Sequence, residues 1–466
     1  MKTTVICSSW LSGYGHRLDT KPYVGGALET KVFLEQLPLT KELVRDLVLP
    51  DFGGIYFAGR ESVTWVDSSE YGIPFLRGKD IQLADLSESP WISKRQVELN
   101  PTFLIRKGMT LITRSGTIGK TAYVRAEMDG MATSDPLRVV PDPQKIPPGY
   151  LYAYLSSKFG VPLLASGAYG AIIQHLEPSD IASIPVPRLG DALEHEIHEL
   201  IEQAAELRAE GHKLIVENCA ELVSFLRFPP LRKGFVWNCG WSVVSSANLN
   251  LRLEGHYHSA VAKEVEDLIR GCHCGFKTIR EVAARFFKPP MFKRLRVDDE
   301  TQGRQFVSGI DAYGFRSSDV RYVSNITPNF GEFILQRGSV IFQAAGSIYG
   351  LFGRALFVRG WLEDKFCADD MYRIVPQSEE DGAYIFTFLR TPYGRTLIQR
   401  ASAGHAIPRV WDPQMSQLIL PWPEPHERNR FANLVFRAHD IVEEARQKED
   451  EAIARVERSL DTATRS

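Results

Sequence analysis

An internal repeat is the feature that most constrains this chain. The segment LIRKGMTLITRSG (104–116) aligns with ILQRGSVIFQAAG (334–346), 230 positions later. Three further pairs keep offsets of 234 to 236 positions: GKTAYV (119–124) with GRALFV (353–358), RVVP (138–141) with RIVP (373–376), and IPVP (184–187) with LPWP (420–423). A unit of about 235 residues used twice predicts two similar domains in tandem.

The loop RSGTIGKT (114–121) is close to a phosphate-binding loop, G-x-x-x-x-G-K-[ST]. Counting back from Gly119, the first glycine of that pattern would fall at position 114, which is Arg114. The second copy, AAGSIYGLFGRAL, is four residues longer and has Arg354 in place of Lys120. Aliphatic and aromatic residues flank both loops, so we predict a β-hairpin in each copy and no nucleotide site.

Each copy ends in a segment typical of a long helix. Residues 191–226 and 426–460 contain no proline, and proline-rich stretches precede both. Heptad-like stripes run along them: Leu193, Ile197, Leu200, Ala204, Leu207, Gly211 and Leu214 in the first, and Phe431, Leu434, Ala438, Ile441, Ala445, Ala452 and Val456 in the second. We predict that these helices pack antiparallel and fix the separation of the domains. The alternative is that each helix only caps its own domain.

Composition describes an ordinary globular protein. The chain has 466 residues, of which 44% are hydrophobic and 24% charged, enough for two to four domains. Neither a signal peptide nor an apolar run of about 18 residues is visible, so we expect a cytoplasmic protein. Six cysteines are too few for a disulfide framework. Cys272-His273-Cys274 has no second ligand cluster beside it, so no metal is predicted.

Charge is unevenly distributed although the net charge is only −2. Residues 77–125 carry nine basic and four acidic side chains, and residues 277–316 carry nine basic and five acidic ones. The first long helix has the opposite bias, with nine acidic residues against Arg208 and Lys213. A solvated charged face explains any single run. Because the pattern recurs in both copies, we favour binding of nucleic acid by the domains.

The sequence gives little support for a catalytic function. An amino-methyltransferase needs a loop of the type [D/N/S]-P-P-[Y/F], and the nearest strings, NPTF (100–103) and KPPMF (288–292), neither fit nor recur. A nuclease needs clustered carboxylates around a metal ion, and no convincing set is present. We therefore predict no catalytic residue. A repeat scaffold that binds only protein stays open as a further alternative.

The organisation as a whole resembles the specificity (S) subunit of type I restriction-modification systems. The resemblance spans essentially the whole chain, and its best parts are SGTIGK early in the unit and YGAIIQHLEPSDIASIPVP late in it. It implies a non-catalytic subunit that recognises double-stranded DNA and docks two adenine-methyltransferase subunits, with two restriction subunits in the full assembly. S-adenosylmethionine and ATP would then be bound by the partners. The alternative within this class is a reader for another type I-like system.

These observations predict an α+β fold with pseudo-two-fold symmetry. Two tandem mixed α/β target-recognition domains with β-hairpins are joined and spaced by two long antiparallel helices in a coiled coil. The expected ranges are 1–187 for the first domain, 188–228 for the first helix, 229–423 for the second domain and 424–466 for the second helix. Because the copies differ in sequence, the target should be bipartite and asymmetric.

Candidate DNA contacts are loop residues that can neutralise phosphates or form paired hydrogen bonds with bases. In the first domain they are Arg77, Lys79, Arg114, Ser115, Thr117, Lys120, Tyr169, Gln174 and His175. In the second domain they are Ser308, Gln343, Ser347, Tyr349, Arg354, His405 and Arg409.

Overall fold

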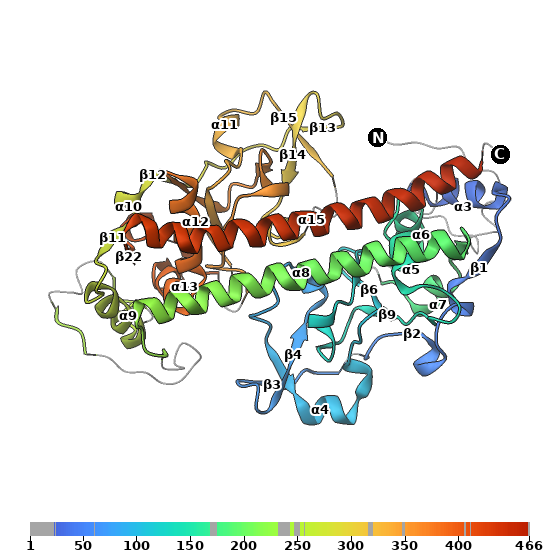
Figure 1. Ribbon diagram of the computed structural model, residues 1–466, viewed down its shortest axis with the longest axis horizontal. Helices are drawn as coiled ribbons and strands as arrows, with labels where there is room; N and C mark the ends of the chain where they lie inside the picture. The colour runs from blue at the N-terminus through green and yellow to red at the C-terminus, as the bar shows by residue number, and fades with distance from the viewer. Residues whose placement is uncertain are drawn as a thin grey trace. The chain divides into compact units, whose positions relative to one another are not determined.

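The computed structural model divides into two compact units. It describes residues 23, 25–59, 61–167, 175–231, 243–246, 252–255, 257–315, 320–346, 350–404, 407–410 and 412–464. Unit 1 comprises Met1–Ala209 with Glu444–Ser466, and unit 2 comprises Glu210–Glu443. Each unit therefore includes part of both long helices, α8 (Asp191–Leu226) and α15 (Pro425–Ala463), which are drawn in green and red (Figure 1).

Among its described residues, unit 1 contains two four-stranded sheets and a two-stranded pair. The first sheet has the order β2-β9-β6-β7 and is antiparallel throughout: β2 (Ile55–Tyr56), β6 (Thr110–Ile112), β7 (Thr121–Tyr123) and β9 (Leu137–Val139). The second has the order β3-β5-β4-β8, with β4 and β8 parallel: β3 (Trp65–Val66), β4 (Gly72–Leu76), β5 (Trp91–Ser93) and β8 (Ala132–Thr133). The pair and the helices are β1 (Lys41–Leu43) with β10 (Pro185–Pro187), α3 (Ala27–Gln36), α4 (Lys94–Leu99), α5 (Pro148–Leu155), α6 (Gly160–Gly167) and α7 (Pro178–Ala182).

In its described part, unit 2 repeats both four-stranded sheets and the two-stranded pair of unit 1 in the same strand order, and it has one further two-stranded pair. Its antiparallel sheet has the order β12-β19-β16-β17: β12 (Ala283–Phe287), β16 (Val340–Gln343), β17 (Ala355–Phe357) and β19 (Met371–Pro376). The sheet with a parallel pair has the order β13-β15-β14-β18: β13 (Arg296–Val297), β14 (Gly303–Val307), β15 (Tyr322–Ser324) and β18 (Phe366–Cys367). The pairs are β11 (Phe276–Thr278) with β22 (Ile419–Pro421), and β20 (Ser402–Ala403) with β21 (Arg409–Val410). The helices are α9 (Ala260–Arg270), α10 (Ile279–Val282), α11 (Phe330–Phe333), α12 (Glu379–Arg390), α13 (Pro392–Arg400) and α14 (Asp412–Ser416). The predicted α+β duplication is confirmed.

The loop that resembles a phosphate cradle is the turn of the β6–β7 hairpin, as predicted. Thr113 closes the turn, because its N–H donates to the carbonyl of Lys120 over 2.9 Å and its side-chain oxygen accepts from the Lys120 N–H over 2.9 Å. Gly116 and Gly119 have φ values of 73° and 81°, a left-handed conformation that favours glycine. A strand follows the turn where a nucleotide-binding loop would need a helix.

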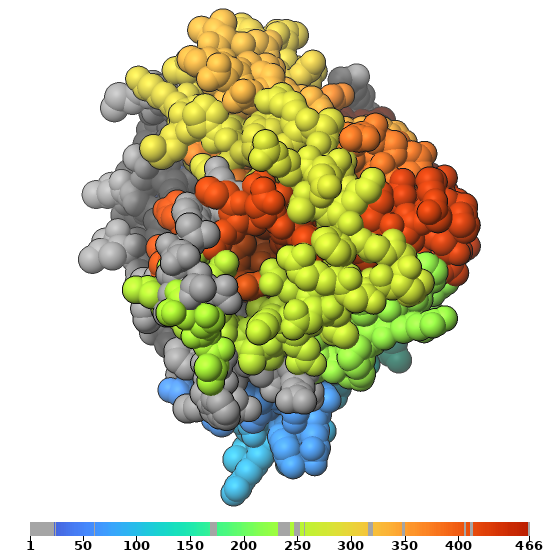
Figure 2. All heavy atoms as spheres, turned by 90° about the vertical axis from the view of Figure 1, so that its left-hand side faces the viewer, coloured from blue at the N-terminus to red at the C-terminus, as the bar shows by residue number. Residues whose placement is uncertain are grey.

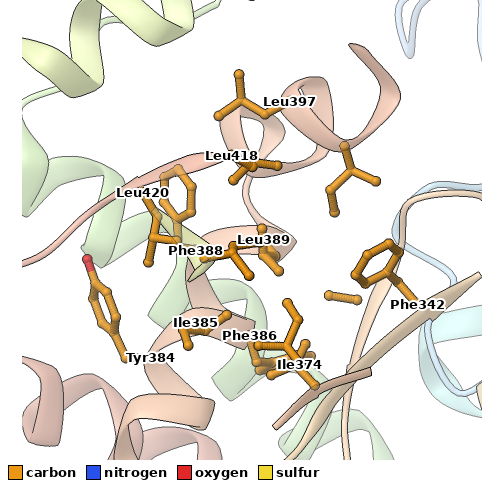
Figure 3. Close-up of a cluster of buried hydrophobic side chains, with 14 of the residues drawn as sticks. Phe342, Ile374, Tyr384, Ile385, Phe386, Phe388, Leu389, Leu397, Leu418 and Leu420 are labelled. Atoms are coloured by element: carbon orange, nitrogen blue, oxygen red, sulfur yellow. The ribbon is translucent and has the colours of Figure 1, made fainter. Parts of the chain in front are cut away.

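Each unit buries an apolar core between its antiparallel sheet and a helix. In unit 2, Phe342 of β16 and Ile374 of β19 face Ile385 and Leu389 of α12, with Phe388 beside them (Figure 3). Unit 1 repeats this arrangement with residues of β6, β9 and α5: Ile112, Leu137, Val139, Leu151 and Leu155. VIF (340–342) and its counterpart TLI (110–112) thus lie in equivalent strands, and all three residues of each are buried.

An arginine is buried at the same place in both cores. Arg138 in β9 donates to the carbonyls of Phe103 and Pro136, each over 3.0 Å. Its counterpart Arg373 in β19 donates to the carbonyls of Met371 and Cys367 over 2.7 and 3.1 Å. Burial lowers the pKa of Arg138 to about 10, and the guanidinium remains charged at neutral pH. These arginines are the first residues of RVVP and RIVP, which explains why both motifs keep them.

The long helices pack antiparallel within each unit, as predicted. In unit 1, Glu196 pairs with Arg455 over 3.0 Å, and Gln203 accepts from Lys448 over 3.0 Å. In unit 2, Arg437 lies 3.7 Å from Glu210, and Arg430 pairs with Glu221 over 2.5 Å. In both units the residue numbers rise along α8 as they fall along α15. Within the described residues, no helix combines the length and apolar character that a membrane span requires.

The predicted heptad stripe of α8 was wrong in part. Ile197, Ala204 and Gly211 are buried, but the leucines of the stripe are only half-buried: Leu193, Leu200, Leu207 and Leu214. Other positions of α8 are buried instead: the apolar residues Ile201, Ala205, Leu222 and Leu226, and the polar residues Glu194, Arg208 and Asn218. Glu194 pairs with Arg188, Arg208 with Glu449, and Asn218 donates to the carbonyl of Phe431 over 3.1 Å. A buried polar group needs a partner, and apolar spacing does not reveal that partner, so the three polar positions could not be identified from the sequence.

Candidate nucleic-acid interface

In unit 1, four loops meet around Asp135, which follows β8. The hydroxyl of Ser115 donates to its carboxylate over 2.6 Å, and Arg114 lies 3.7 Å from it. A Cβ placed on Gly78 would lie 3.6 Å from the same carboxylate, so the Arg77–Asp80 turn adjoins the hairpin loop. Ser115 also forms a β-bridge with His175. The structure thus brings together the turn that contains Arg77 and Lys79, the hairpin loop and His175.

The side chains of this cluster differ in accessibility. Lys79 and Thr117 are exposed, whereas Ser115 and Lys120 are half-buried. The Arg114 side chain is only 3% exposed; it pairs with Glu177 over 2.5 Å, and its guanidinium carbon lies 4.2 Å from the ring centroid of Phe57. A phosphate could contact Arg114 only after the arginine had left these partners. Its position indicates that it supports the loops that surround it.

Unit 2 builds an equivalent cluster around Gly309 and Asp370, whose counterparts in unit 1 are Gly78 and Asp135. A Cβ on Gly309 would lie 3.4 Å from the amide nitrogen of Gln343 and 3.5 Å from both carboxylate oxygens of Asp370. The hydroxyl of Ser308 donates to Asp311 over 2.5 Å and starts the turn that follows β14. The turn that contains Ser308 and Gly309 therefore lies beside Gln343.

Arg409 joins this second cluster through the backbone. It forms a β-bridge with Ala345, and the N–H of Val410 donates to the carbonyl of Ala344 over 2.8 Å. The bridge of Ala345 with Arg409 is the counterpart of the bridge of Ser115 with His175. Arg409 is exposed. It is therefore a cation at the surface of the loop cluster.

Equivalent side chains fix the turn to the hairpin in both units. Gln82 donates its amide to the carbonyl of Thr121 over 3.1 Å in unit 1. The equivalent Tyr313 in unit 2 donates its hydroxyl to the carbonyl of Arg354 over 2.7 Å and accepts from the N–H of Gln343 over 3.3 Å. Burial raises the pKa of Tyr313, which keeps the phenol protonated as a donor. Arg354 itself is a buried residue of this loop.

The two clusters share a backbone plan but present different side chains. The exposed Lys79 of unit 1 is replaced by Ile310 in unit 2, and Arg114 and Ser115 are replaced by Ala344 and Ala345. The candidates Tyr169, Gln174, Ser347, Tyr349 and His405 lie outside the described residues. Asp135 and Asp370 were not among the candidates. Their offset of 235 positions, the same as for RVVP and RIVP, is the signal that could have identified them.

The nearest match to a methyltransferase loop has a structural role. The side-chain oxygen of Asn100 accepts from the N–H of Thr102 over 3.3 Å, and its amide donates to the carboxylate of Glu61 over 2.7 Å. Phe103 is completely buried. These residues cap a short 3-10 helix, Pro101–Phe103. Among the residues described by the structure, no three or more histidines, cysteines and carboxylates gather in a way that could hold a metal ion.

Comparisons with solved structures find twelve similar chains, among them the following three. A type I restriction-modification S subunit from M. genitalium is 14% identical, with 92% of this chain and 96% of that chain covered and a TM-score of 0.36. The HsdS subunit from Thermoanaerobacter tengcongensis, and a chain from work on complex assembly and conformational transition of the type I R-M system, are each 14% identical over 92% of this chain and 98% of theirs, with TM-scores of 0.28. No protein-family model and no curated protein matches the sequence.

Proposed function

We propose that this chain is a non-catalytic DNA-recognition subunit that reads a bipartite, asymmetric target and directs partner adenine methyltransferases to it. The observation that carries the proposal is the duplicated loop cluster, which has one backbone plan and two sets of side chains. Two copies of one plan suit a duplex with approximate two-fold symmetry. Different side chains at equivalent positions would give the two half-sites different sequences.

The described side chains divide by the contacts they can make. Lys79 and Arg409 are exposed cations and would neutralise phosphates, which sets the register on the duplex. Ser115, Thr117 and Gln343 carry hydrogen-bonding groups and would contact base edges. Arg114 and Arg354 are buried and would act by holding the loops in place. Restriction subunits would join the same assembly where the system includes them.

The long helices would set the distance between the half-sites. The 36 residues of α8 correspond to a helix of about 54 Å. Its nine acidic residues disfavour contact with a polyanion along the helix and leave binding to the loops. In this proposal the unread spacer of the target is determined by helix length.

Electrophoretic mobility shift of a randomised duplex pool at about 50 mM and about 200 mM salt tests the DNA-binding part. The purified chain should bind weakly at low salt and lose most of its affinity at high salt, because phosphate contacts release counterions. Adding the methyltransferase partner should enrich one split sequence from the pool. The competing function, a scaffold that binds only protein, predicts no shift at either salt concentration and no enrichment with the partner.

A further inference from the structure

The Cys272-His273-Cys274 motif forms a tight turn between α9 and β11. The N–H of Cys272 donates to the carbonyl of Ile269 over 3.1 Å and continues the end of the helix. The N–H of Gly275 donates to the carbonyl of Cys272 over 3.1 Å, and Gly275 has a φ of 74°. This turn brings the two sulfur atoms to 3.1 Å from each other. The sequence CHC therefore produces a vicinal pair of thiols.

The turn lies at the edge of the unit 2 core. Cys272 and Cys274 are both half-buried against that core, and the His273 ring lies 5.4 Å from the ring of Phe225 near the end of α8. The N–H of Trp422, which follows β22, donates to the carbonyl of Gly275 over 3.0 Å. The segment from α9 to β12, coloured yellow-green, forms much of the face seen in Figure 2. His273, between the two cysteines, is exposed, so a small reagent in solvent can reach this turn.

We propose that Cys272 and Cys274 are a redox-active vicinal dithiol that a hydroperoxide oxidises to a disulfide within the turn. In the first step the Cys272 thiolate attacks one peroxide oxygen, the O–O bond breaks, and an alcohol or water leaves once its oxygen takes a proton. Cys272 is now a sulfenic acid. The Cys274 sulfur then attacks the Cys272 sulfur, the S–S bond forms, and the hydroxyl leaves as water with the Cys274 proton. Two thiols are oxidised and one peroxide is reduced.

The electrostatics of the pair agree with this order of events. The hydrogen bond from Cys274 lowers the pKa of Cys272 to about 6, so Cys272 is the nucleophile. The same interaction raises the pKa of Cys274, which keeps its proton until the second step. Cys367 provides an internal contrast, because it is fully buried and burial raises its pKa to about 11. Cys219 lies in α8 with its thiol 3.6 Å from the carbonyl of Thr387.

Peptide mapping of the full-length protein tests the proposal directly, because trypsin cleaves after Arg270 and after Lys277 and releases GCHCGFK. The reduced protein is treated with hydrogen peroxide, denatured, and alkylated with iodoacetamide before digestion. We expect this peptide to lose two hydrogen atoms and to take no alkyl group, and a reductant should restore two alkylation sites. Sulfinic acid on one cysteine with the other still alkylated would overturn the proposal, as would a disulfide to another peptide.

Two variants and one probe separate the vicinal pair from a single reactive thiol. In Cys274→Ser the Cys272 sulfenic acid has no resolving partner and should be trapped by dimedone. The matched control, Cys219→Ser, should leave the disulfide yield unchanged. Phenylarsine oxide, which bridges two adjacent thiols, should bind the reduced wild-type protein and fail to bind after either Cys272→Ser or Cys274→Ser. Equal binding to the serine variants contradicts the vicinal geometry, whether or not those variants fold fully.

Discussion

Replacing Glu449 with glutamine should weaken the packing of α8 on α15 in unit 1. The side chains of Arg208 and Glu449 are only 7% and 3% exposed and form an ion pair, and the hydroxyl of Tyr152 also donates to Glu449. The change leaves the Arg208 guanidinium buried without its carboxylate. Removing one partner of a buried pair costs about 3–5 kcal/mol, so we expect Glu449→Gln to reduce the free energy of unfolding of unit 1 by about that amount.

Amide hydrogen exchange of the full chain measures this effect locally, because α8 residues 191–209 and α15 residues 444–463 should lose protection together. The matched control is Glu196→Gln, which removes a pair with Arg455 on the same two helices. Those side chains are 59% and 35% exposed, and the loss should be about 0–1 kcal/mol. Equal effects of the two substitutions would refute the reasoning.

Unit 2 suggests how the stability lost in Glu449→Gln can be restored. Its residue equivalent to Tyr152 is Phe386, whose ring lies 6.0 Å from that of His439 on α15. Unit 2 thus packs the corresponding position without a phenol. Replacing these three side chains with apolar ones, in Tyr152→Phe with Arg208→Met and Glu449→Leu, removes both charges of the pair. We expect this variant to unfold at or above the wild-type denaturant concentration, since such replacements are often neutral or stabilising.

Three further outcomes are expected. Lys79→Ala should weaken DNA binding and reduce the slope of the logarithm of the DNA-association constant against the logarithm of the salt concentration by about 1. The control Lys213→Ala, on α8, should leave that slope unchanged. Equal slopes for both variants would contradict a phosphate contact of Lys79. Burial lowers the pKa of His439 to about 4. Between pH 6.5 and 4 the unfolded chain therefore binds a proton that the folded chain excludes. Over this range the free energy of unfolding of unit 2 should fall by up to about 3 kcal/mol. Denaturant titrations at both pH values should find this loss reduced in His439→Phe. Inserting three heptads in both α8 and α15 at the boundary between the units should lengthen the unread spacer of the DNA target by about 32 Å, close to one turn of DNA. An insertion in α8 alone should abolish methylation. An unchanged spacer after the double insertion would contradict the role of the helices.

The repeat allowed much of the fold to be predicted from sequence. Aligning GKTAYV with GRALFV excluded a nucleotide site, because the second copy cannot form the same cradle, and the β6–β7 and β16–β17 hairpins follow from that alignment. The proline-free segment 191–226, which was predicted to be a helix, has the same bounds as α8. These features depend on local sequence, which explains why the sequence was sufficient.

Features that depend on distant partners could not be predicted in the same way. Arg114 appeared to be a surface cation, but its partner Glu177 lies 63 residues away and the pair is formed only in the folded unit. The burial of Arg208 similarly requires Glu449, which is 241 residues away. Apolar periodicity favoured the leucines of α8 because it gives no weight to charged residues that are paired inside the core.

The most direct test of the account is genome-wide mapping of methyladenine in a host that carries this chain and its methyltransferase partner, compared with a host that carries the methyltransferase alone. We predict methylation at one split sequence with two different half-sites, which disappears when this chain is absent. Methylation at a contiguous palindrome, or the same methylation in both hosts, would contradict the proposal that two unlike loop clusters of this chain select the target.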